Sequence, residues 1–479
     1  MRNSLRHLAV GLLVSATLAA SACKSRTSRD HAIVIAPDQP LEARDPAGTA
    51  IEHTLGFAAP ETHYIDVTTT VPTGGAETIE LMLPVWTPGS YLVREYARHI
   101  EGLRAATLEG APLAVEKSRK NRWRVTTAGA ARIAVRYRLY ARELTVRTNF
   151  VDRDLAVISG AATFLVPVGE LALPHDIKLT DTEQWPQVGT ALPAHPSGDA
   201  RRFLAPDYDT LVDSPIVLGS GTSHDLEVEG VIHQLASFGG ATVWDDQRAA
   251  SDVTSLIRTQ LEMWRIVPYP RYVFLNILEN SGGGGGLEHK ASTLLLWSPW
   301  STRKRSDYLR WLGLVSHELF HTWNGKRLRP IELGPFDYEN EVHTESLWMV
   351  EGLTSYYDDL LVRRAGLSSH KEYLEALSSQ IDSLESTPGR EVQPLSLSSY
   401  DAWIKYYRGD ENSVNSSISY YTKGAVVGFL LDAEIRKRSL GRRSLDDLMR
   451  QAYERYAGDQ GYTSEQFRTL AEEVAGGSL

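Results

Sequence analysis

A glutamate stands between two histidines in the segment His317-Glu318-Leu319-Phe320-His321. Apolar residues recur around it at the spacing of a helix. Side chains four residues apart lie on one face of a helix, so both imidazoles can bind one zinc ion. Glu318 is rotated by about 100° from His317 and therefore reaches a metal-bound water instead of the metal. The alternative is a surface helix with two incidental histidines, but buried imidazoles without a partner would be costly in so apolar a segment.

A catalytic zinc site needs a third protein ligand and leaves the fourth position to water. The acidic candidates downstream are Glu339, Glu341, Glu345 and Glu351. Glu351 belongs to an apolar helical run, LWMVEGLTSYYDDLL, that can pack beside the first helix and direct a carboxylate inward. Glu339 and Glu341 fall in a predicted loop, which positions a ligand less rigidly. We therefore expect His317, His321 and Glu351 to bind one Zn²⁺ per chain; a helix-capping or salt-bridged role is the alternative for Glu351.

The composition of the 479-residue chain is that of an ordinary globular protein, with 42% hydrophobic and 23% charged residues. This excludes a largely disordered chain, a collagen-like repeat and a disulfide-rich miniprotein, and the length indicates about two to four domains. The net charge of −10 argues against a nucleic-acid partner, which requires a basic surface. Because Cys23 is the only cysteine, no intrachain disulfide can form and the fold must depend on its hydrophobic core.

Residues 1–23, MRNSLRHLAVGLLVSATLAASAC, have the pattern of an export signal. Two arginines precede an apolar stretch that is too short to span a bilayer, and small residues follow it. The sole cysteine resembles the lipidated first residue of a mature bacterial lipoprotein, although Ala20 stands where leucine is commoner. An ordinary signal peptide cleaved after Ala22 is the alternative. We expect a protein of the cell envelope or periplasm, with membrane attachment through a lipidated Cys23.

The rest of the chain divides into a tether and two folded parts. Residues 24–50 are polar, contain three prolines and show no sustained period, which predicts a flexible tether. Residues 51–225 are rich in two-residue apolar alternation, which predicts an all-β, sandwich-like domain. Residues 226–479 begin with strands and then become mainly helical. Strands are expected at residues 64–71, 133–140, 228–238, 272–278 and 292–297.

Three serine or threonine residues are predicted to begin helices. Ser306 is expected to cap the helix that carries the two histidines. Ser444-x-x-Asp447 and Thr463-x-x-Gln466 have the spacing of capping boxes. No apolar run after the export signal is long enough for a transmembrane helix.

Four segments resemble the glycyl aminopeptidase family of HExxH zinc metallopeptidases: HELFHTWNGKRLRP, FDYENEVHTESLWMVEGLTSYY, GGLEHKAST and YYTKGAVVGFLLDAEIR. The N-terminal domain of that family is matched by LPVWTPGSYLVREYAR and YARELTVRTNFVD, so the resemblance covers residues 53–475. It implies a thermolysin-like α+β zinc-peptidase catalytic domain over residues 226–479, with a helical C-terminal part. Family members usually continue into a PDZ domain, which is expected to be missing because this sequence ends in AEEVAGGSL. The chemistry should then be intact, with low activity if the absent segment also supports the cleft.

The position of the third ligand separates this family from more distant relatives. Aminopeptidase N and leukotriene hydrolase share the HExxH helix and a glutamate in an EG-containing helix, but at a shorter spacing. Here 29 residues, 322–350, separate His321 from Glu351, which fits the glycyl aminopeptidase pattern. Glu339 follows His321 after 17 residues, 322–338, and nearly matches the shorter spacing, so it is the rival ligand.

The resemblance assigns further site residues. Gly285-Gly286-Leu287-Glu288 corresponds to a strand edge that recognises a substrate's free amino group, since glycines let a peptide backbone approach and a carboxylate binds an ammonium ion. Without the resemblance, the five glycines at residues 282–286 would indicate a flexible loop. Tyr421 matches the tyrosine that stabilises the oxyanion, with Tyr420 as the alternative. A structural or solvated role is expected for the basic cluster of Lys326, Arg327 and Arg329.

The expected reaction is removal of one N-terminal residue, a small one such as glycine or alanine, from a peptide substrate. Zinc would lower the pKa of its water, and Glu318 would take the proton and deliver it to the leaving amine. Tyr421 would stabilise the oxyanion, and Glu288 would set the register. Two alternatives remain: a zinc endopeptidase, for which Glu288 would be irrelevant, and a non-catalytic envelope binding protein, which would not need Glu318.

Overall fold

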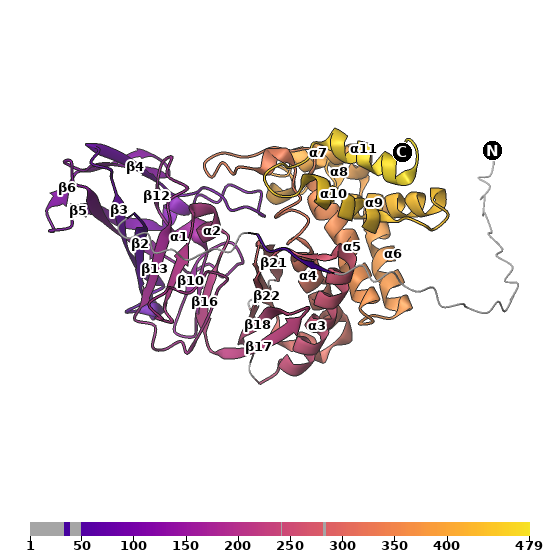
Figure 1. Ribbon diagram of the computed structural model, residues 1–479, viewed down its shortest axis with the longest axis horizontal. Helices are drawn as coiled ribbons and strands as arrows, with labels where there is room; N and C mark the ends of the chain where they lie inside the picture. The colour runs from indigo at the N-terminus through magenta and orange to yellow at the C-terminus, as the bar shows by residue number, and fades with distance from the viewer. Residues whose placement is uncertain (1–32, 39–48, 241, 281–283) are drawn as a thin grey trace, which may run out of the picture. The chain divides into compact units, whose positions relative to one another are not determined.

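The structure of the chain is a computed structural model that describes residues 33–38, 49–240, 242–280 and 284–479. The expected export signal with Cys23, and Gly282 and Gly283 of the glycine run, lie outside these residues, so export and lipidation stay predictions. A β-rich part ends at residue 219 and is followed by a mixed part that becomes helical (Figure 1). The predicted order of an N-terminal β domain and a helical C-terminal region is confirmed.

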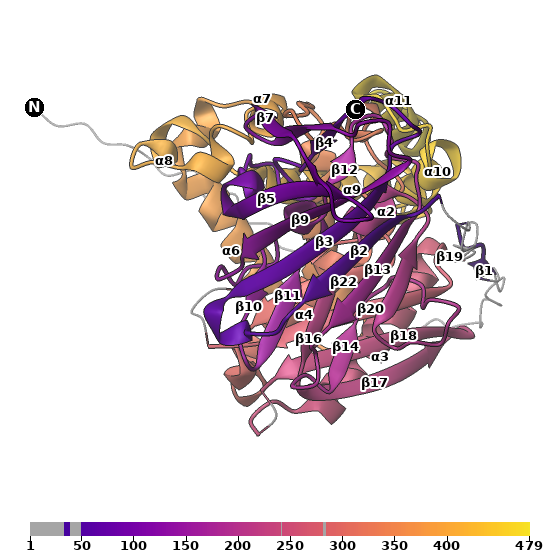
Figure 2. The same ribbon diagram turned by 90° about the vertical axis from the view of Figure 1, so that its left-hand side faces the viewer.

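A seven-stranded sheet forms one layer of the β-rich part (Figure 2). Its strands, in order across the sheet, are β15 (Arg202–Ala205), β13 (His175–Thr180), β2 (Ile51–Gly56), β3 (Tyr64–Pro72), β9 (Arg132–Tyr140), β5 (Ile100–Thr107) and β6 (Pro112–Leu113). The strands expected at residues 64–71 and 133–140 are confirmed as β3 and β9. Along β9 every second residue is buried, as the two-residue period requires: Ile133, Val135, Tyr137 and Leu139.

Two four-stranded sheets complete the β-rich part. One consists of β12 (Val166–Pro167), β4 (Thr78–Met82), β8 (Arg122–Thr126) and β7 (Val115–Arg119). The other consists of β10 (Phe150–Val151), β11 (Leu155–Ile158), β16 (Ile216–Gly219) and β14 (Gln187–Gly189). Leu81 and Trp123 of the first share a hydrophobic core with Val135 of the seven-stranded sheet, so the two sheets pack face to face. The part also contains two short helices, α1 (Gly160–Thr163) and α2 (Tyr208–Val212).

A five-stranded sheet begins directly after β16. Its order is β17 (Gly221–Val228), β18 (Val231–Gly239), β20 (Arg271–Leu278), β22 (Ser292–Trp297) and β21 (Gly285–Glu288), with the three inner strands parallel and both edge strands antiparallel. Alternate residues of β20 enter different cores, because Val273 and Leu275 pack with the β-rich part and Tyr272 and Phe274 with the helices. Burial on both faces explains the almost continuous apolar sequence of this strand.

Two of the three strands expected in this region are confirmed, at residues 272–278 and 292–297. The strand expected at residues 228–238 is divided, because Glu229 and Gly230 adopt positive φ angles and form the turn between β17 and β18. The expected domain boundary between residues 225 and 226 falls inside β17, which already pairs with β18 at Gly221. The division into domains stays a prediction.

Helices pack on the face of this sheet that lies away from the β-rich part, and they form the C-terminal region. They are α3 (Asp246–Trp264), α4 (Arg305–Phe320), α5 (Leu353–Arg364), α6 (His370–Ser386), α7 (Leu395–Tyr400), α8 (Ser413–Ser416), α9 (Tyr420–Arg438), α10 (Leu445–Tyr456) and α11 (Ser464–Ala475). The capping boxes that begin at Ser444 and Thr463 are confirmed. The prediction that Ser306 caps this helix is wrong. Lys304 is the last extended residue before α4, so Ser306 lies inside its first turn. None of the described helices has the length and apolar character needed to cross a membrane.

The expected tether, residues 24–50, lies mostly outside the described residues, and its described part is not free. Val34 and Ile35 form β1, which pairs in parallel with β19 (Ile266–Val267). Asp38 forms an ion pair with Arg327, with 2.7 Å between Asp38 Oδ2 and Arg327 Nη2. Residues 33–38 therefore dock on the five-stranded region, which corrects the prediction for this short stretch, because the pattern Ile-Val-Ile supplies enough apolar and main-chain contact to pair.

An aromatic cluster joins the β-rich part to the helical region. Trp86, in the loop after β4, packs edge-on against Trp403 with ring centroids 5.1 Å apart. Its indole Nε1 donates to the main-chain oxygen of Asp337 at 2.7 Å. Tyr91 and Tyr420 complete the cluster. Since Trp86 is fully buried, its ring holds the loop at residues 84–95 against the helical region.

We expect Trp86→Ala to lower the free energy of unfolding by about 3–5 kcal/mol, because it removes a buried ring and leaves a cavity. Denaturant unfolding followed by circular dichroism measures this change. Trp300→Ala is the control, since Trp300 is 52% exposed and should contribute little. Equal losses in the two variants would contradict a structural role for the aromatic cluster.

Candidate active site

The two histidines of α4 and the glutamate of a following turn converge on one point. Glu351 lies in η5 (Trp348–Gly352), a π-helical turn of the kind that recurs at functional sites. Its Oε2 atom is 3.5 Å from His317 Nε2 and 3.1 Å from His321 Nε2. The two Nε2 atoms are 3.0 Å apart. One ligand atom from each residue lies within 4.8 Å of the others, so these three side chains form a group that could hold a metal ion.

Contacts behind the imidazole rings fix their orientation. His321 Nδ1 donates to the main-chain oxygen of Asn324 at 2.8 Å. His317 Nδ1 faces Asp358 Oδ2 at 3.4 Å. These contacts occupy the Nδ1 atoms and direct both Nε2 atoms toward Glu351, which is the usual arrangement behind metal-binding histidines.

The side chain of Asn324 also connects α4 to the turn that carries Glu351. Its amide donates to the main-chain oxygens of Met349 and Val350, each at 2.9 Å, and to Thr354 Oγ1 at 3.1 Å. Asn324 is 1% exposed, so water does not compete for these hydrogen bonds. The relative position of the imidazoles and the carboxylate is therefore set by one buried amide.

The chemistry of the three side chains fits a divalent metal ion. Two imidazoles and one carboxylate are a common ligand set of catalytic metal sites. Burial alone would raise the pKa of Glu351, but the charge and hydrogen bonds of His321 and His317 outweigh it and hold the pKa well below the ordinary range. Glu351 is thus an ionised carboxylate at 2% exposure, and a cation beside it would offset the cost of burying that charge.

The rival ligand Glu339 is engaged elsewhere. Its Oε1 accepts from Arg122 Nε at 2.7 Å and from Asn121 Nδ2 at 2.9 Å, and its Oε2 pairs with Arg122 Nη2. These partners belong to the β-rich part. Glu341 and Glu345, the other downstream acids, are exposed and lie outside the metal-binding group.

Glu318 lies beside the metal-binding group without joining it. Its side chain is buried, and its Oε2 has no hydrogen-bond partner among the described residues. Burial raises the pKa of Glu318 above that of an ordinary carboxyl group, although the two neighbouring histidines oppose the shift. A buried carboxylate with a free oxygen beside a metal site can accept a proton from a water molecule.

Strand β21 passes directly over Glu318. A Cβ atom at Gly286 would overlap the Glu318 carboxylate, so the strand can approach only because this residue is glycine. A Cβ atom at Gly285 would have no atom within 4 Å. The two glycines therefore differ: Gly286 makes room for Glu318, and Gly285 faces open space.

Glu288 ends β21 and lines the same cavity as the histidines. Gly89, from a turn of the β-rich part, lies against its carboxylate, because a Cβ at Gly89 would be 2.5 Å from Glu288 Oε2. The next residue, His289, faces Asp213 Oδ1 at 3.1 Å from its Nδ1. Glu288 is only 6% exposed, and residues of the β-rich part lie against its carboxylate and against the next residue along the chain.

Helix α9 brings Tyr421 to the cavity. Gly352 and Gly424 allow the helical segments to touch backbone to backbone, since a Cβ at Gly352 would be 2.5 Å from Gly424 Cα. Tyr421 lines the cavity, and its ring stacks on His317 with centroids 6.2 Å apart. Tyr420 is fully buried in the aromatic cluster and does not line the cavity.

The cavity has a volume of about 680 Å³. Several of the residues that line it are not among the site residues predicted from the sequence. They include Gly89, Arg94, Arg147, Asp358 and Asp359. Asp358 is detectable in principle, because it follows Glu351 by two helical turns and so shares its face. Arg94 and Arg147 lie within family-like segments, but no local pattern separates them from surface arginines.

The basic cluster after α4 is structural, as expected. Lys326 Nζ is 2.6 Å from Asp213 Oδ1, and both Lys326 and Arg327 are buried. The Arg327 guanidinium donates to the main-chain oxygens of Thr322, Lys290 and Pro268. Neither residue, nor Arg329, lines the cavity around the metal-binding group.

Comparison with known proteins identifies the family of this chain. The family model for the Peptidase M61 N-terminal domain matches residues 52–220, and the model for M61 glycyl aminopeptidase matches residues 310–427. The chain is also similar to the crystal structure of an aminopeptidase N family protein from Idiomarina loihiensis, with a TM-score of 0.84 and 32% identity over 88% of this chain and 72% of that chain. The chain belongs to the M61 glycyl aminopeptidase family. It is a metallopeptidase, and the metal-binding group and Glu318 fall within the second matched segment.

We expect Gly286→Ala to reduce kcat of the peptidase for peptide hydrolysis by about 10²–10⁴-fold, because the new methyl group would displace the Glu318 carboxylate from its position as a general base. Steady-state kinetics on a short peptide measures the loss. Gly409→Ala is the control, since Gly409 is exposed, has a negative φ angle and leaves the added methyl group 3.7 Å from the nearest atom, so kcat should stay near the wild-type value. A fully active Gly286→Ala enzyme would rule out this arrangement of Glu318.

Proposed function

We propose that this M61 peptidase is a zinc-dependent aminopeptidase that removes one small N-terminal residue, such as glycine or alanine, from peptides. The observation that carries the proposal is the presence of Glu288 in the same cavity as His317, His321, Glu351 and Glu318. A buried carboxylate at that place binds an ammonium group and so selects the amino end of a peptide. The preference for a small first residue rests on the description of the family.

His317, His321 and Glu351 would hold the zinc ion. Zinc bound there supplies a Lewis acid and lowers the pKa of a coordinated water. The contacts of His321 with Asn324 and of His317 with Asp358 keep the imidazole rings in a binding orientation before any metal arrives.

Glu318 is the proposed general base and acid. Its Oε2 has no partner among the described residues, and burial raises its pKa, so its carboxylate is suited to take a proton from the attacking water and to return it to the leaving amine. Because Gly286 has no side chain, the Glu318 carboxylate can lie close to β21, where the peptide is proposed to lie.

Tyr421 is the proposed donor to the oxyanion. Burial raises the pKa of Tyr421 well above the ordinary value, and the negative charge of Glu351 adds to the shift, so the phenol keeps its proton. A protonated hydroxyl beside the reacting carbonyl can donate a hydrogen bond to the charge that develops there.

Glu288 sets the register of the peptide. When the ammonium group is bound at Glu288, the first peptide bond lies nearest to Glu318 and the others lie farther along the cavity. An endopeptidase would use the same metal-binding residues but would gain nothing from a buried carboxylate at this place. A purely binding role is excluded by the family, and it would leave Glu318 without a function.

We expect Glu351→Gln to lower the affinity for zinc by at least about 100-fold, because a neutral amide replaces a buried anionic ligand. Isothermal titration calorimetry of the metal-free protein with Zn²⁺ measures the affinity. Glu339→Gln is the matched control and should bind zinc like the wild type, since Glu339 is paired with Arg122. Loss of zinc in Glu339→Gln but not in Glu351→Gln would make Glu339 the third ligand.

We expect N-acetylation of an alanyl peptide to abolish its cleavage, because the modification removes the positive charge that Glu288 binds. The comparison is made by chromatography of the products from the free and the acetylated peptide. Glu288→Gln should raise KM for the free peptide about tenfold or more, since a charge-assisted hydrogen bond is lost. Cleavage of the acetylated peptide at the free-peptide rate would indicate an endopeptidase.

A further inference from the structure

The active-site cavity continues into two further cavities along the β-rich part. The first, of about 330 Å³, shares Leu92, Arg94 and Tyr407 with the active-site cavity. The second, of about 300 Å³, shares Tyr96, Arg98, His99, Glu143 and Thr148 with the first. The shared residues make the three cavities one continuous depression that leads away from the metal-binding group.

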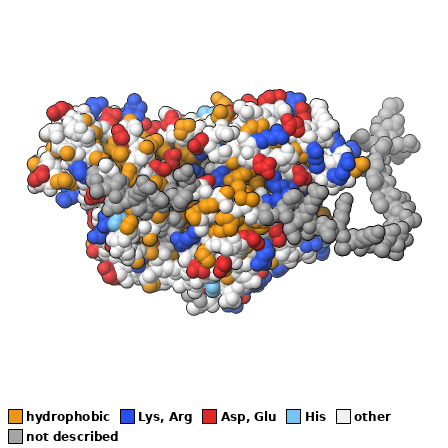
Figure 3. Space-filling view, viewed as in Figure 1, with side chains coloured by type: hydrophobic (Ala, Val, Ile, Leu, Met, Phe, Trp, Pro, Cys, Tyr) orange, Lys and Arg blue, Asp and Glu red, His pale blue; other side chains and the backbone are white. Residues whose placement is uncertain are grey.

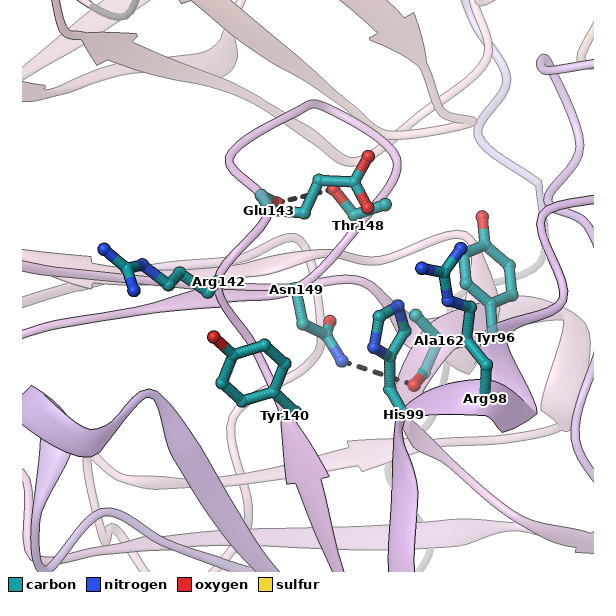
Figure 4. Close-up of a pocket in the computed structure, with 9 residues that line it drawn as sticks. All are labelled: Tyr96, Arg98, His99, Tyr140, Arg142, Glu143, Thr148, Asn149 and Ala162. Atoms are coloured by element: carbon teal, nitrogen blue, oxygen red, sulfur yellow. Dashed lines mark hydrogen bonds between the residues drawn. The ribbon is translucent and has the colours of Figure 1, made fainter.

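Six arginines line the three cavities. Four of them form what we call the arginine trough: Arg94, Arg98, Arg147 and Arg408. The other two are Arg142 and Arg310, and Arg310 is paired with Asp307. Figure 4 shows the far end, where Arg98 stands beside His99 and Tyr96 on one side and Glu143 lies across from them. Arg142, at the edge of the same cavity, points away from the others (Figure 4). Glu143 is the one acidic residue that lines the two outer cavities, so positive charge dominates the trough.

None of the four arginines forms an ion pair with a carboxylate in the part of the chain that the structure describes. The Arg94 guanidinium donates to Ser90 Oγ at 2.9 Å, and the Nε atoms of Arg94 and Arg147 are buried without an acceptor. Burial lowers the pKa of Arg94, which is the sign of a cation that lacks a counter-charge. An unpaired donor on a buried guanidinium costs free energy unless a ligand satisfies it.

Several arginines elsewhere in the protein are paired with carboxylates. Arg122 is paired with Glu80 and Glu339, and Arg327 with Asp38. On the face seen in Figure 3, acidic and basic side chains are interspersed and no large region carries one sign. Other arginines, such as Arg201 and Arg271, also lack a carboxylate partner among the described residues, but they are scattered over the fold. What distinguishes the four arginines of the trough is that they line adjoining cavities that begin at the metal-binding group.

Acidic side chains are concentrated in the active-site cavity, and basic side chains become more frequent away from it. Glu288, Asp358 and Asp359 line the active-site cavity, as do Arg94 and Arg147. Arg94 also lines the neighbouring cavity, where Glu143 is the one acidic residue. A peptide bound with its amino group at Glu288 would extend its remaining residues along the cleft. Guanidinium groups bind carboxylates through two parallel hydrogen bonds, so the trough suits an anionic group on that remaining portion.

We propose that the arginine trough binds carboxylates of the substrate on the C-terminal side of the cleaved bond, with Arg94 and Arg147 as the principal contacts. This inference rests on the proposed aminopeptidase function and specifies its substrate class: short peptides with a free C-terminal carboxylate, and longer peptides with aspartate or glutamate after the cleaved bond. Peptides with lysine at those positions are disfavoured by repulsion.

The test compares the amidated peptides Ala-Ala-Glu-Ala, Ala-Ala-Gln-Ala and Ala-Ala-Lys-Ala, together with Ala-Ala as free acid and as amide. Binding to zinc-loaded Glu318→Gln protein is measured by isothermal titration calorimetry, and KM and kcat are measured with wild-type enzyme. We expect the glutamate peptide to bind about tenfold or more tightly than the lysine peptide, as one charge-assisted contact would give. The comparison of Ala-Ala acid and amide separates a terminal carboxylate from a side-chain carboxylate.

The double variant Arg94→Ala/Arg147→Ala, made in both backgrounds, should remove the preference, so that the glutamate, glutamine and lysine peptides bind with similar affinity. Arg147→Glu should invert the preference toward lysine, and Arg147→Lys should retain part of it. Arg104→Ala is the matched control, because Arg104 is an exposed arginine of β5 that lines none of the three cavities. Circular dichroism melting curves show whether each variant folds.

Equal binding of the three peptides by the Glu318→Gln protein would overturn the inference, whatever the catalytic result. An unchanged preference in folded Arg94→Ala/Arg147→Ala protein would overturn it as well. The proposed function fails by a different result, in which wild-type enzyme cleaves none of the free-amino peptides. Because the calorimetry needs no turnover, that failure would still leave the binding preference measured.

Discussion

The amide of Asn324 holds together two helical segments that reach the metal-binding group from different parts of the sequence. Its nitrogen donates to main-chain oxygens beside Glu351, while its own main-chain oxygen accepts from His321. One residue therefore sets both the rotation of an imidazole and the position of the carboxylate. Since these contacts are buried, water does not compete for them, and they direct the side chains of His321 and Glu351 toward one point.

Glycines, which have no side chain, are as important to the shape of the cavity as the reactive residues. Gly286 leaves room for the Glu318 carboxylate, Gly89 for Glu288, and the pair Gly352 and Gly424 lets α9 approach η5 closely enough to bring Tyr421 to the metal-binding group. At each place an added Cβ atom would lie 2.5 Å or less from a neighbouring atom, which is well inside van der Waals contact. From the sequence, the glycines of β21 are expected to form a surface for the peptide. The structure shows in addition that a side chain at Gly286 would overlap the Glu318 carboxylate.

Local patterns predict those features that depend on neighbouring residues. The alternation of β9 and the capping boxes of α10 and α11 are set within a few residues, and the sequence predicts them correctly. Helix α3 also has a local signal, an Asp245 cap followed by apolar residues at helical spacing. Contacts between distant segments leave no such signal. Nothing near Glu339 indicates its partner Arg122, and nothing near Arg94 indicates that its guanidinium has no carboxylate partner.

The metal-binding group by itself does not distinguish an amino end from any other part of a peptide. That distinction must come from residues around it, and most of them belong to the β-rich part: Gly89 lies against Glu288, Asp213 contacts His289, and Arg94 and Arg147 line the cavity. The aromatic cluster around Trp86 holds the loop that contains Gly89 and Arg94 against the helical region. Stability and substrate selection are thus linked, because the same buried rings that join the two parts also position the residues that would choose the substrate.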